Sequence, residues 1–205
     1  MKKRSQPVSK KRRSATRGTA SHACLKVAIS EKEIRQRVRE LAKQIDHDYQ
    51  GKTLLVVGVL ENCLMFVADL VRDLTIPVAY SFIGSHTRDS DSGRVAMREI
   101  TYIPPVNVGG KHVLLVAGVL QSGVTLDYLC RTLLAQRPTS LRTAALLDKN
   151  EERKVDVPVD YAGFKVSDKF LVGYGLGYQD QYRGLPYLAH MTARKTATRR
   201  AARRI

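Results

Sequence analysis

The stretch VAGVLQSGVTL, residues 116–126, carries the clearest chemical signal in this sequence. An apolar run is followed by a Ser-Gly pair and then by residues that favour a helix, which predicts a strand that turns tightly into a helix. Free backbone N–H groups and the helix dipole at such a turn favour a bound phosphate. Residues 113–126 nevertheless contain no carboxylate. A phosphate cradle and a plain strand–turn–helix connection both remain open interpretations of this stretch.

Helical and strand patterns alternate along the body of the chain. Ser30 and Glu33 form a capping box, and apolar residues at helical spacing continue it, which predicts a helix over 31–49. Further helices are expected at 63–74 and 126–137. Continuous apolar or alternating runs predict strands at 53–60, 76–84, 98–103, 111–120, 141–149, 161–166 and 169–175, with a polar flexible loop over 85–94.

Strands that read as solid apolar runs between helices predict an α/β fold with a parallel sheet covered on both faces. In such sheets ligands bind beyond the carboxyl ends of the strands. The candidate site is therefore formed by the segments that follow Leu60, Leu120, Leu147 and Gly173.

Composition excludes several classes of protein. The chain has 205 residues, 43% of them hydrophobic, which suits one domain with a proper core. No apolar run approaches the roughly 18 residues of a membrane span, so no membrane partner is expected. The three cysteines, Cys24, Cys63 and Cys130, form no CxxC pair and have no His at ligand spacing, which argues against a zinc site or a disulfide framework. A reducing, cytoplasmic location is the default expectation, with association with a nucleoid or ribosome as a variant of it.

The positive charge is concentrated at the two ends of the chain. The formal net charge is +16, but residues 21–187 hold 21 basic and 19 acidic residues and are nearly neutral. We therefore expect a disordered basic N-terminal arm over 1–24, a folded domain over 25–187, and a basic C-terminal arm over 188–205. The side chains expected to contact nucleic acid are Lys2, Lys3, Arg4, Lys10, Lys11, Arg12, Arg13, Arg199, Arg200, Arg203 and Arg204.

Polycationic arms of this kind bind RNA or DNA by counterion release, without sequence preference. The alternatives are a solubilising or expression-dependent extension and an organelle transit peptide. A transit peptide is amphipathic, whereas residues 1–20 contain almost no large apolar side chain, and it would not explain the second arm.

The strand-end segments, taken in order, resemble the hypoxanthine-guanine phosphoribosyltransferases, a family of type I phosphoribosyltransferases. The resemblance extends from about Lys52 to Tyr187. It is most specific in residues 140–187, where LLDK, RKVDVPVDY, F-x-V-G-Y-G-L and Y-R-x-L-P-Y follow one another, and it includes VGVLENCLMFVADL at 57–70. It implies a twisted parallel sheet flanked by helices, with a small hood formed by the C-terminal part, and it implies a homodimer or homotetramer.

The resemblance also assigns a purine pocket and a phosphate cradle. Lys149 would donate to the exocyclic oxygen of the purine, Phe170 would stack on it, and the Leu171 backbone would read its edge. Arg183 would face diphosphate. The phosphate would lie on Ser122, Gly123, Val124 and Thr125. The alternative is that Phe170 belongs to the core and that Lys149 and Arg183 are ordinary surface charges.

The chain departs from the family where the family places its acids. It has Ala117 and Gly118 where the family has Glu-Asp, Gln121 where the family has a catalytic Asp, and Gly177 where the family has a metal-binding Asp. Glu61 and Asn62 replace a Lys-Gly pair that holds diphosphate. We therefore assign no catalytic residue and no metal ligand, and Mg²⁺ is expected only if the protein is active.

Three functions remain open from the sequence. The leading hypothesis is a phosphoribosyltransferase-like pseudoenzyme that keeps a pocket for a purine nucleoside monophosphate and binds nucleic acid in a regulatory or structural role. The alternative is an active purine-salvage enzyme that makes IMP or GMP from phosphoribosyl diphosphate, with acids such as Glu61, Asp89 or Asp91 binding the metal. In the third, the body is inert and only the arms function.

Overall fold

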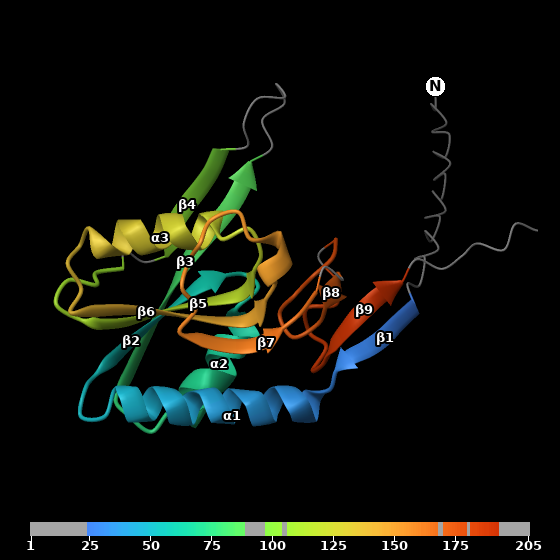
Figure 1. Ribbon diagram of the computed structural model, residues 1–205, viewed down its shortest axis with the longest axis horizontal. Helices are drawn as coiled ribbons and strands as arrows, with labels where there is room; N and C mark the ends of the chain where they lie inside the picture. Colours follow the sequence, from blue (N-terminus) through green and yellow to red (C-terminus); the bar gives the residue numbers. More distant parts are fainter. Residues whose placement is uncertain (1–23, 89–96, 104–105, 168–169, 180, 193–205) are drawn as a thin grey trace, which may run out of the picture.

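The structure is a computed structural model that describes residues 24–88, 97–103, 106–167, 170–179 and 181–192. Its centre is a six-stranded sheet in the order β4-β3-β2-β5-β6-β7 (Figure 1). Five of these strands are parallel, and β4 pairs antiparallel with β3. The strands are β2 Leu54–Leu60, β3 Val78–Arg88, β4 Met97–Ile103, β5 His112–Leu120, β6 Ser140–Asp148 and β7 Tyr161–Lys165. The predicted α/β fold with a parallel sheet is confirmed.

Helices cover both faces of this sheet. Figure 1 shows α1 (Glu31–Asp48) and α2 (Leu64–Asp73) on one face and α3 (Val124–Leu134) on the other. Successive residues of β2 point to opposite faces, so that Leu54 and Val56 pack with α1 and α2 while Leu55 and Val57 pack with α3. Burial on both faces explains why these strands read as unbroken apolar runs.

Helix α1 begins where the capping box predicts. The Ser30 side chain accepts from the Glu33 backbone N–H, and the Glu33 carboxylate accepts from the Ser30 N–H at 2.7 Å. Five apolar side chains on one face of the helix are buried against the sheet, namely Ile34, Val38, Leu41, Ala42 and Ile45.

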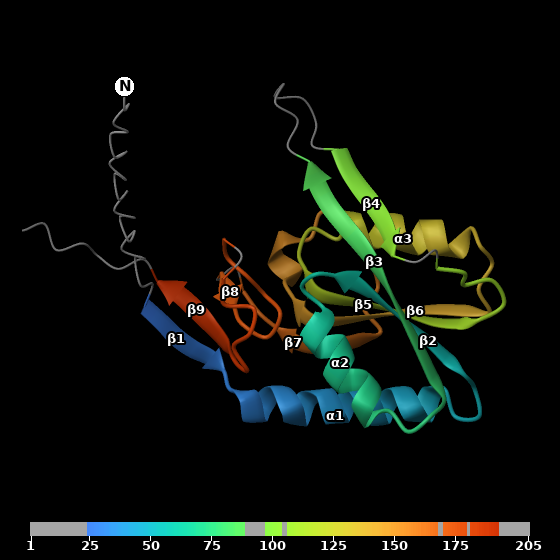
Figure 2. The same cartoon turned by 180° about the vertical axis from the view of Figure 1, so that it is seen from behind.

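A second sheet of three strands forms a hood beside the first (Figure 2). Its order is β1-β9-β8, with β1 at Cys24–Ile29, β8 at Leu171–Val172 and β9 at Leu188–Thr192. The expectation that the C-terminal part alone forms the hood is incomplete, because β1 pairs antiparallel with β9.

Two further expectations change at the hood. The strand predicted over 169–175 is reduced to β8, because Gly173 and Gly175 adopt φ angles of 104° and 93° and turn the chain. The predicted domain boundary at residue 187 moves to Thr192, because β9 lies inside the range assigned to the C-terminal arm. The remainder of both arms, and residues 89–94 of the predicted loop, lie outside the described residues. Within the described ranges, no helix is long and apolar enough to cross a membrane.

Candidate functional site

A cavity of about 260 Å³ lies at the carboxyl ends of β2 and β5. It is lined by Val59, Leu60 and Asn62 after β2, by residues 117–123, and by Thr125, Leu126 and Leu129 of α3. The strand ends expected to carry the site therefore do meet there. None of the lining residues carries a charge, so the cavity offers backbone groups, hydroxyls and amides to a ligand but no carboxylate.

The turn into α3 has the geometry expected of a phosphate cradle. Gly123 is the N-cap residue of α3 with φ 82°, and Ser122 and Thr125 line the cavity. The first backbone N–H groups of an α-helix have no partner within the helix, so they are available to an anion. Val124 is not among the lining residues, and its side chain is exposed, so only its backbone could contribute.

Gly123 is also required by the protein itself. A Cβ atom at this position would lie 2.5 Å from the carbonyl oxygen of Val155, and the left-handed φ disfavours any side chain. The backbone N–H groups of Lys154 and Val155 both donate to the Ser122 carbonyl, at 3.0 and 3.1 Å. The glycine therefore lets this neighbouring segment pack against the turn, an explanation that does not require a phosphate.

The positions of the family's acids are closed as well as uncharged. A Cβ atom at Gly118 would lie 2.6 Å from the carbonyl carbon of Asn62, so the loop after β2 packs directly against the end of β5. Mg²⁺ prefers carboxylate and water oxygens. Among the side chains that the structure describes, no group of three or more His, Cys, Asp or Glu residues could hold a metal ion. The described residues therefore do not fit a bound Mg²⁺.

The residues expected to hold the purine have unusual environments. Lys149 is buried, with 8% of its surface exposed, whereas Phe170 is 50% exposed. The alternative of a core phenylalanine and a surface lysine is therefore wrong for both residues. A buried ammonium and an exposed aromatic ring are both costly without a partner or ligand, and such residues mark binding sites. Leu171 lies buried in β8.

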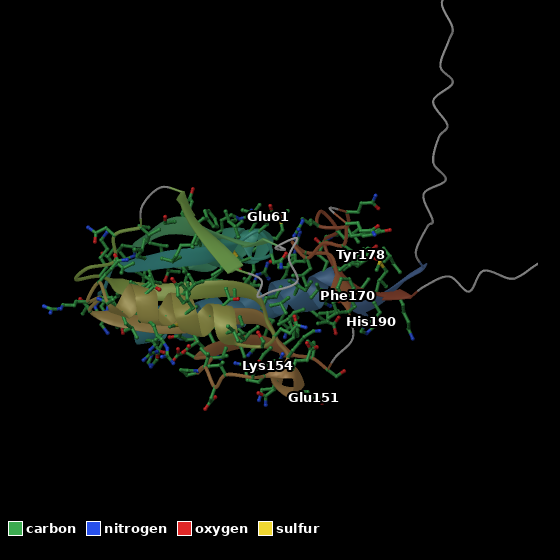
Figure 3. The ribbon with its side chains drawn as sticks, turned by 90° about the horizontal axis from the view of Figure 1, so that it is seen from above. Glu61, Glu151, Lys154, Phe170, Tyr178 and His190 are labelled. Carbon is green, nitrogen blue, oxygen red and sulfur yellow. The ribbon has the colours of Figure 1, made fainter. Side chains whose placement is uncertain are left out.

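An aromatic pair stands on the hood. The rings of Phe170 and Tyr178 meet edge to face with their centroids 5.6 Å apart, and Tyr178 is 41% exposed. Figure 3 shows both residues together with His190, while Glu151 and Lys154 lie on the segment after β6 and Glu61 lies beyond the other side of the pair. Sequence reasoning missed Tyr178, although its place eight residues after Phe170 in a glycine-rich turn segment was a usable signal.

Arg183 is held by the loop that replaces the family's diphosphate loop. Its Nη2 lies 3.2 Å from the Glu61 carboxylate, and its Nη1 donates to the Asn62 side-chain oxygen at 2.7 Å and to the Gly175 carbonyl at 3.0 Å. A Cβ atom at Gly177 would lie 2.8 Å from Nε of Arg183. The absence of a side chain at Gly177 thus allows Arg183 to reach across to Glu61 and Asn62.

Glu152 joins the site although the sequence analysis did not select it. It ends the 3₁₀ helix Asn150–Glu152 directly after β6. One carboxylate oxygen lies 3.0 Å from Lys149 Nζ, and the other accepts a hydrogen bond from the Gln121 side-chain amide. The two adjacent acids after LLDK were a signal for such a pairing. Lys149 and Gln121 are therefore brought together, through Glu152.

Comparisons with known proteins agree with this geometry. The phosphoribosyl transferase domain family matches residues 29–179. The hypoxanthine-guanine phosphoribosyltransferase of Dictyostelium discoideum is 38% identical over 169 residues, which are 80% of this chain and 94% of that protein. The Bacillus subtilis protein of the same name is 36% identical over 82% of this chain and 93% of its own length.

Solved structures give the same result. A hypoxanthine-guanine phosphoribosyltransferase from Bacillus anthracis, with a HEPES molecule in its active site, superposes with a TM-score of 0.76 at 35% identity. The superposition covers 82% of this chain and 98% of that one. With this agreement in sequence, topology and site position, the chain belongs to the hypoxanthine-guanine phosphoribosyltransferase family.

Proposed function

We propose that this protein binds a purine nucleoside monophosphate at the carboxyl edge of its sheet and has lost the transferase step of its family. The observation that carries the proposal is the uncharged cavity around Ala117, Gly118 and Gln121, beside a turn that keeps the form of a phosphate cradle. The phosphate would rest on the start of α3. The base would lie between Phe170 and Lys149, with the Leu171 backbone at its edge.

The missing acids account for the loss of catalysis. The Gln121 amide cannot take up a proton, and a lost general base costs about 10²–10⁴-fold in rate. Ala117 and Gly118 offer no carboxylate to the sugar hydroxyls or to a metal, and each lost charged hydrogen bond costs on the order of 1.5–3 kcal/mol. These losses act on one chemical step and leave the scaffold intact.

The charge around Arg183 points in the same direction. The Glu61 carboxylate lies at the position where the family's loop would hold diphosphate, and it is already paired with Arg183 at 3.2 Å. Diphosphate would have to displace this pair and approach a like charge. A nucleoside monophosphate lacks the diphosphate group, so the pair does not oppose it.

A second candidate is an active purine-salvage phosphoribosyltransferase that makes IMP or GMP from phosphoribosyl diphosphate. The relatives favour it, because proteins named for this activity match nearly their whole length. Its metal would require acids outside the family positions, such as Glu61, or Asp89 and Asp91, which lie outside the described residues.

The decisive experiment is an assay for IMP or GMP formation from hypoxanthine or guanine, phosphoribosyl diphosphate and Mg²⁺. We expect no turnover above background. Turnover within about tenfold of ordinary enzyme rates would overturn the proposal and establish the second candidate. Titration of phosphoribosyl diphosphate with and without Mg²⁺ separates the two independently, since the proposal predicts little metal-dependent affinity.

The arms supply a separate part of the proposal. They carry fourteen basic residues and no acids within 1–20 and 188–205, so they would bind RNA or DNA by counterion release in the cytoplasm, with a steep salt dependence. The test removes residues 1–20 and 193–205 and leaves β9 in place. Unchanged binding to a mixed-sequence duplex or single strand would contradict this role. A homodimer or homotetramer is proposed from the family alone, and light scattering during size-exclusion chromatography checks it.

A further inference from the structure

The feature that the family's chemistry does not explain is Glu152, which lies between Lys149 and Gln121. Its side chain is 26% exposed and that of Lys149 is 10% exposed, so the pair is largely shielded from water. A shielded ammonium needs a countercharge, and the Glu152 oxygen at 3.0 Å supplies it. The charge of Lys149 is therefore balanced within the chain before any base arrives.

This pairing changes what the pocket offers to a base. An unpaired lysine would present a cation and donors, which suit the carbonyl oxygen of a 6-oxopurine. The group formed by Lys149 and Glu152 is neutral overall and adds carboxylate oxygens, which can only accept hydrogen bonds. The Gln121 amide is also directed to Glu152, which holds the carboxylate in place from a second side.

The two classes of purine differ at this point of contact. An exocyclic amino group has hydrogens that a carboxylate accepts, and a bond to an ionised acceptor is stronger than a neutral one. An exocyclic carbonyl oxygen brings a second acceptor toward the carboxylate with no hydrogen between them. A site with buried polar groups discriminates strongly against a ligand that leaves those groups unpaired.

We infer that Glu152 makes the base pocket select a 6-aminopurine nucleotide, such as AMP, over the 6-oxopurine nucleotides IMP and GMP. The inference rests on the proposed function, which places the base against Lys149. It deepens that function by naming the ligand class. Glu152 acts here as a specificity-determining residue and has no part in a bond-breaking step.

The test measures the affinities of AMP, IMP and GMP for the full-length chain by isothermal titration calorimetry. We expect AMP to bind about tenfold more tightly than IMP, the equivalent of one charge-assisted hydrogen bond. Glu152→Gln removes the charge and adds an amide donor, so the preference should fall to about threefold or less, or reverse. This comparison needs no variant for its first result, and a thermal melt checks that the variant folds.

Glu151→Gln is the matched control, because Glu151 is exposed on the same short helix. It should leave the preference for AMP unchanged. IMP binding as tightly as AMP to the natural chain would overturn the inference and leave the proposed nucleotide binding standing. A preference for AMP that survives Glu152→Gln would also overturn it, because another group would then read the base. If none of the three nucleotides binds, the proposed function itself fails and the inference fails with it.

Discussion

A Cβ atom at Gly118 would lie 2.6 Å from the carbonyl carbon of Asn62, so the end of β5 and the loop after β2 occupy each other's space. The loop is fastened there by Arg183, which bonds the Asn62 side chain and the Gly175 carbonyl. The missing acid at Gly118 and the altered loop at Asn62 are thus two parts of one packing arrangement. Restoring a family residue at one of them meets the other.

Gly118→Asp should therefore destabilise the protein without restoring activity. The contact is with backbone, which cannot rotate away as a side chain can, and overpacking of this kind costs about 1–3 kcal/mol in the free energy of unfolding. Urea denaturation measures the change. Gly184→Asp is the matched control, because a Cβ atom at Gly184 meets nothing within 4 Å. If both variants are equally stable, the loop moves freely and the packing argument is wrong.

Gly177→Asp should be tolerated, in contrast to Gly118→Asp. A Cβ atom at Gly177 meets only the Arg183 side chain, 2.8 Å from Nε, and a flexible side chain can give way. The new carboxylate would attract the guanidinium that it displaces. We expect a change in the free energy of unfolding within about 0.5 kcal/mol, as for ordinary surface substitutions. A loss as large as that of Gly118→Asp would show that Arg183 is fixed in place.

The ion pair between Glu61 and Arg183 predicts a gain of function in anion binding. Glu61→Gln removes a carboxylate 3.2 Å from the guanidinium, so inorganic diphosphate should bind about three- to tenfold more tightly, a change of roughly 1 kcal/mol for an exposed pair. Calorimetry at low and high salt measures it, and the gain should shrink as salt screens the charges. Glu40→Gln on α1 is the control. Unchanged affinity in Glu61→Gln would mean that Glu61 does not guard this position.

The sequence predicted the central sheet well because burial on both faces leaves unbroken apolar runs, as in β2 and β5. It missed β1, whose residues Lys26, Val27 and Ala28 are exposed and give no clear period. It placed the strand after residue 169 in the wrong sheet, because pairing with β9 is a long-range contact. It also selected Lys149 and Gln121 but not Glu152, since only the fold brings residues 121 and 152 together.

Two of the cysteines should be unreactive in the folded protein. Burial raises the pKa of Cys63 to about 12, and burial together with the nearby Asp127 and Asp160 carboxylates raises that of Cys130 to about 11. Because the thiolate is the nucleophile, iodoacetamide at about pH 8 should modify both far more slowly than a free thiol of pKa about 8.5. Peptide mass spectrometry resolves each site, and denatured protein is the control. Rapid labelling of Cys63 in the native state would show that the segment after β2 opens readily.

The carboxylate of Asp48 predicts how stability changes at low pH. It accepts a hydrogen bond from the Tyr161 hydroxyl at 2.7 Å and is paired with Arg142, so it joins the end of α1 to β6 and β7. These contacts, led by the Tyr161 bond, hold the pKa of Asp48 below its ordinary value. A lowered pKa in the folded state means that the contribution to stability is complete above the unfolded pKa of about 3.9, and is lost as the pH falls through the folded value. Asp48→Asn should therefore cost about 1 kcal/mol at neutral pH, a figure reduced for the partial exposure of the pair. The free energies of unfolding of the two proteins should converge below about pH 4. Urea denaturation across this range tests the convergence, with exposed Asp156→Asn as the control, and a constant difference down to pH 3 would contradict the role given to the Asp48 charge.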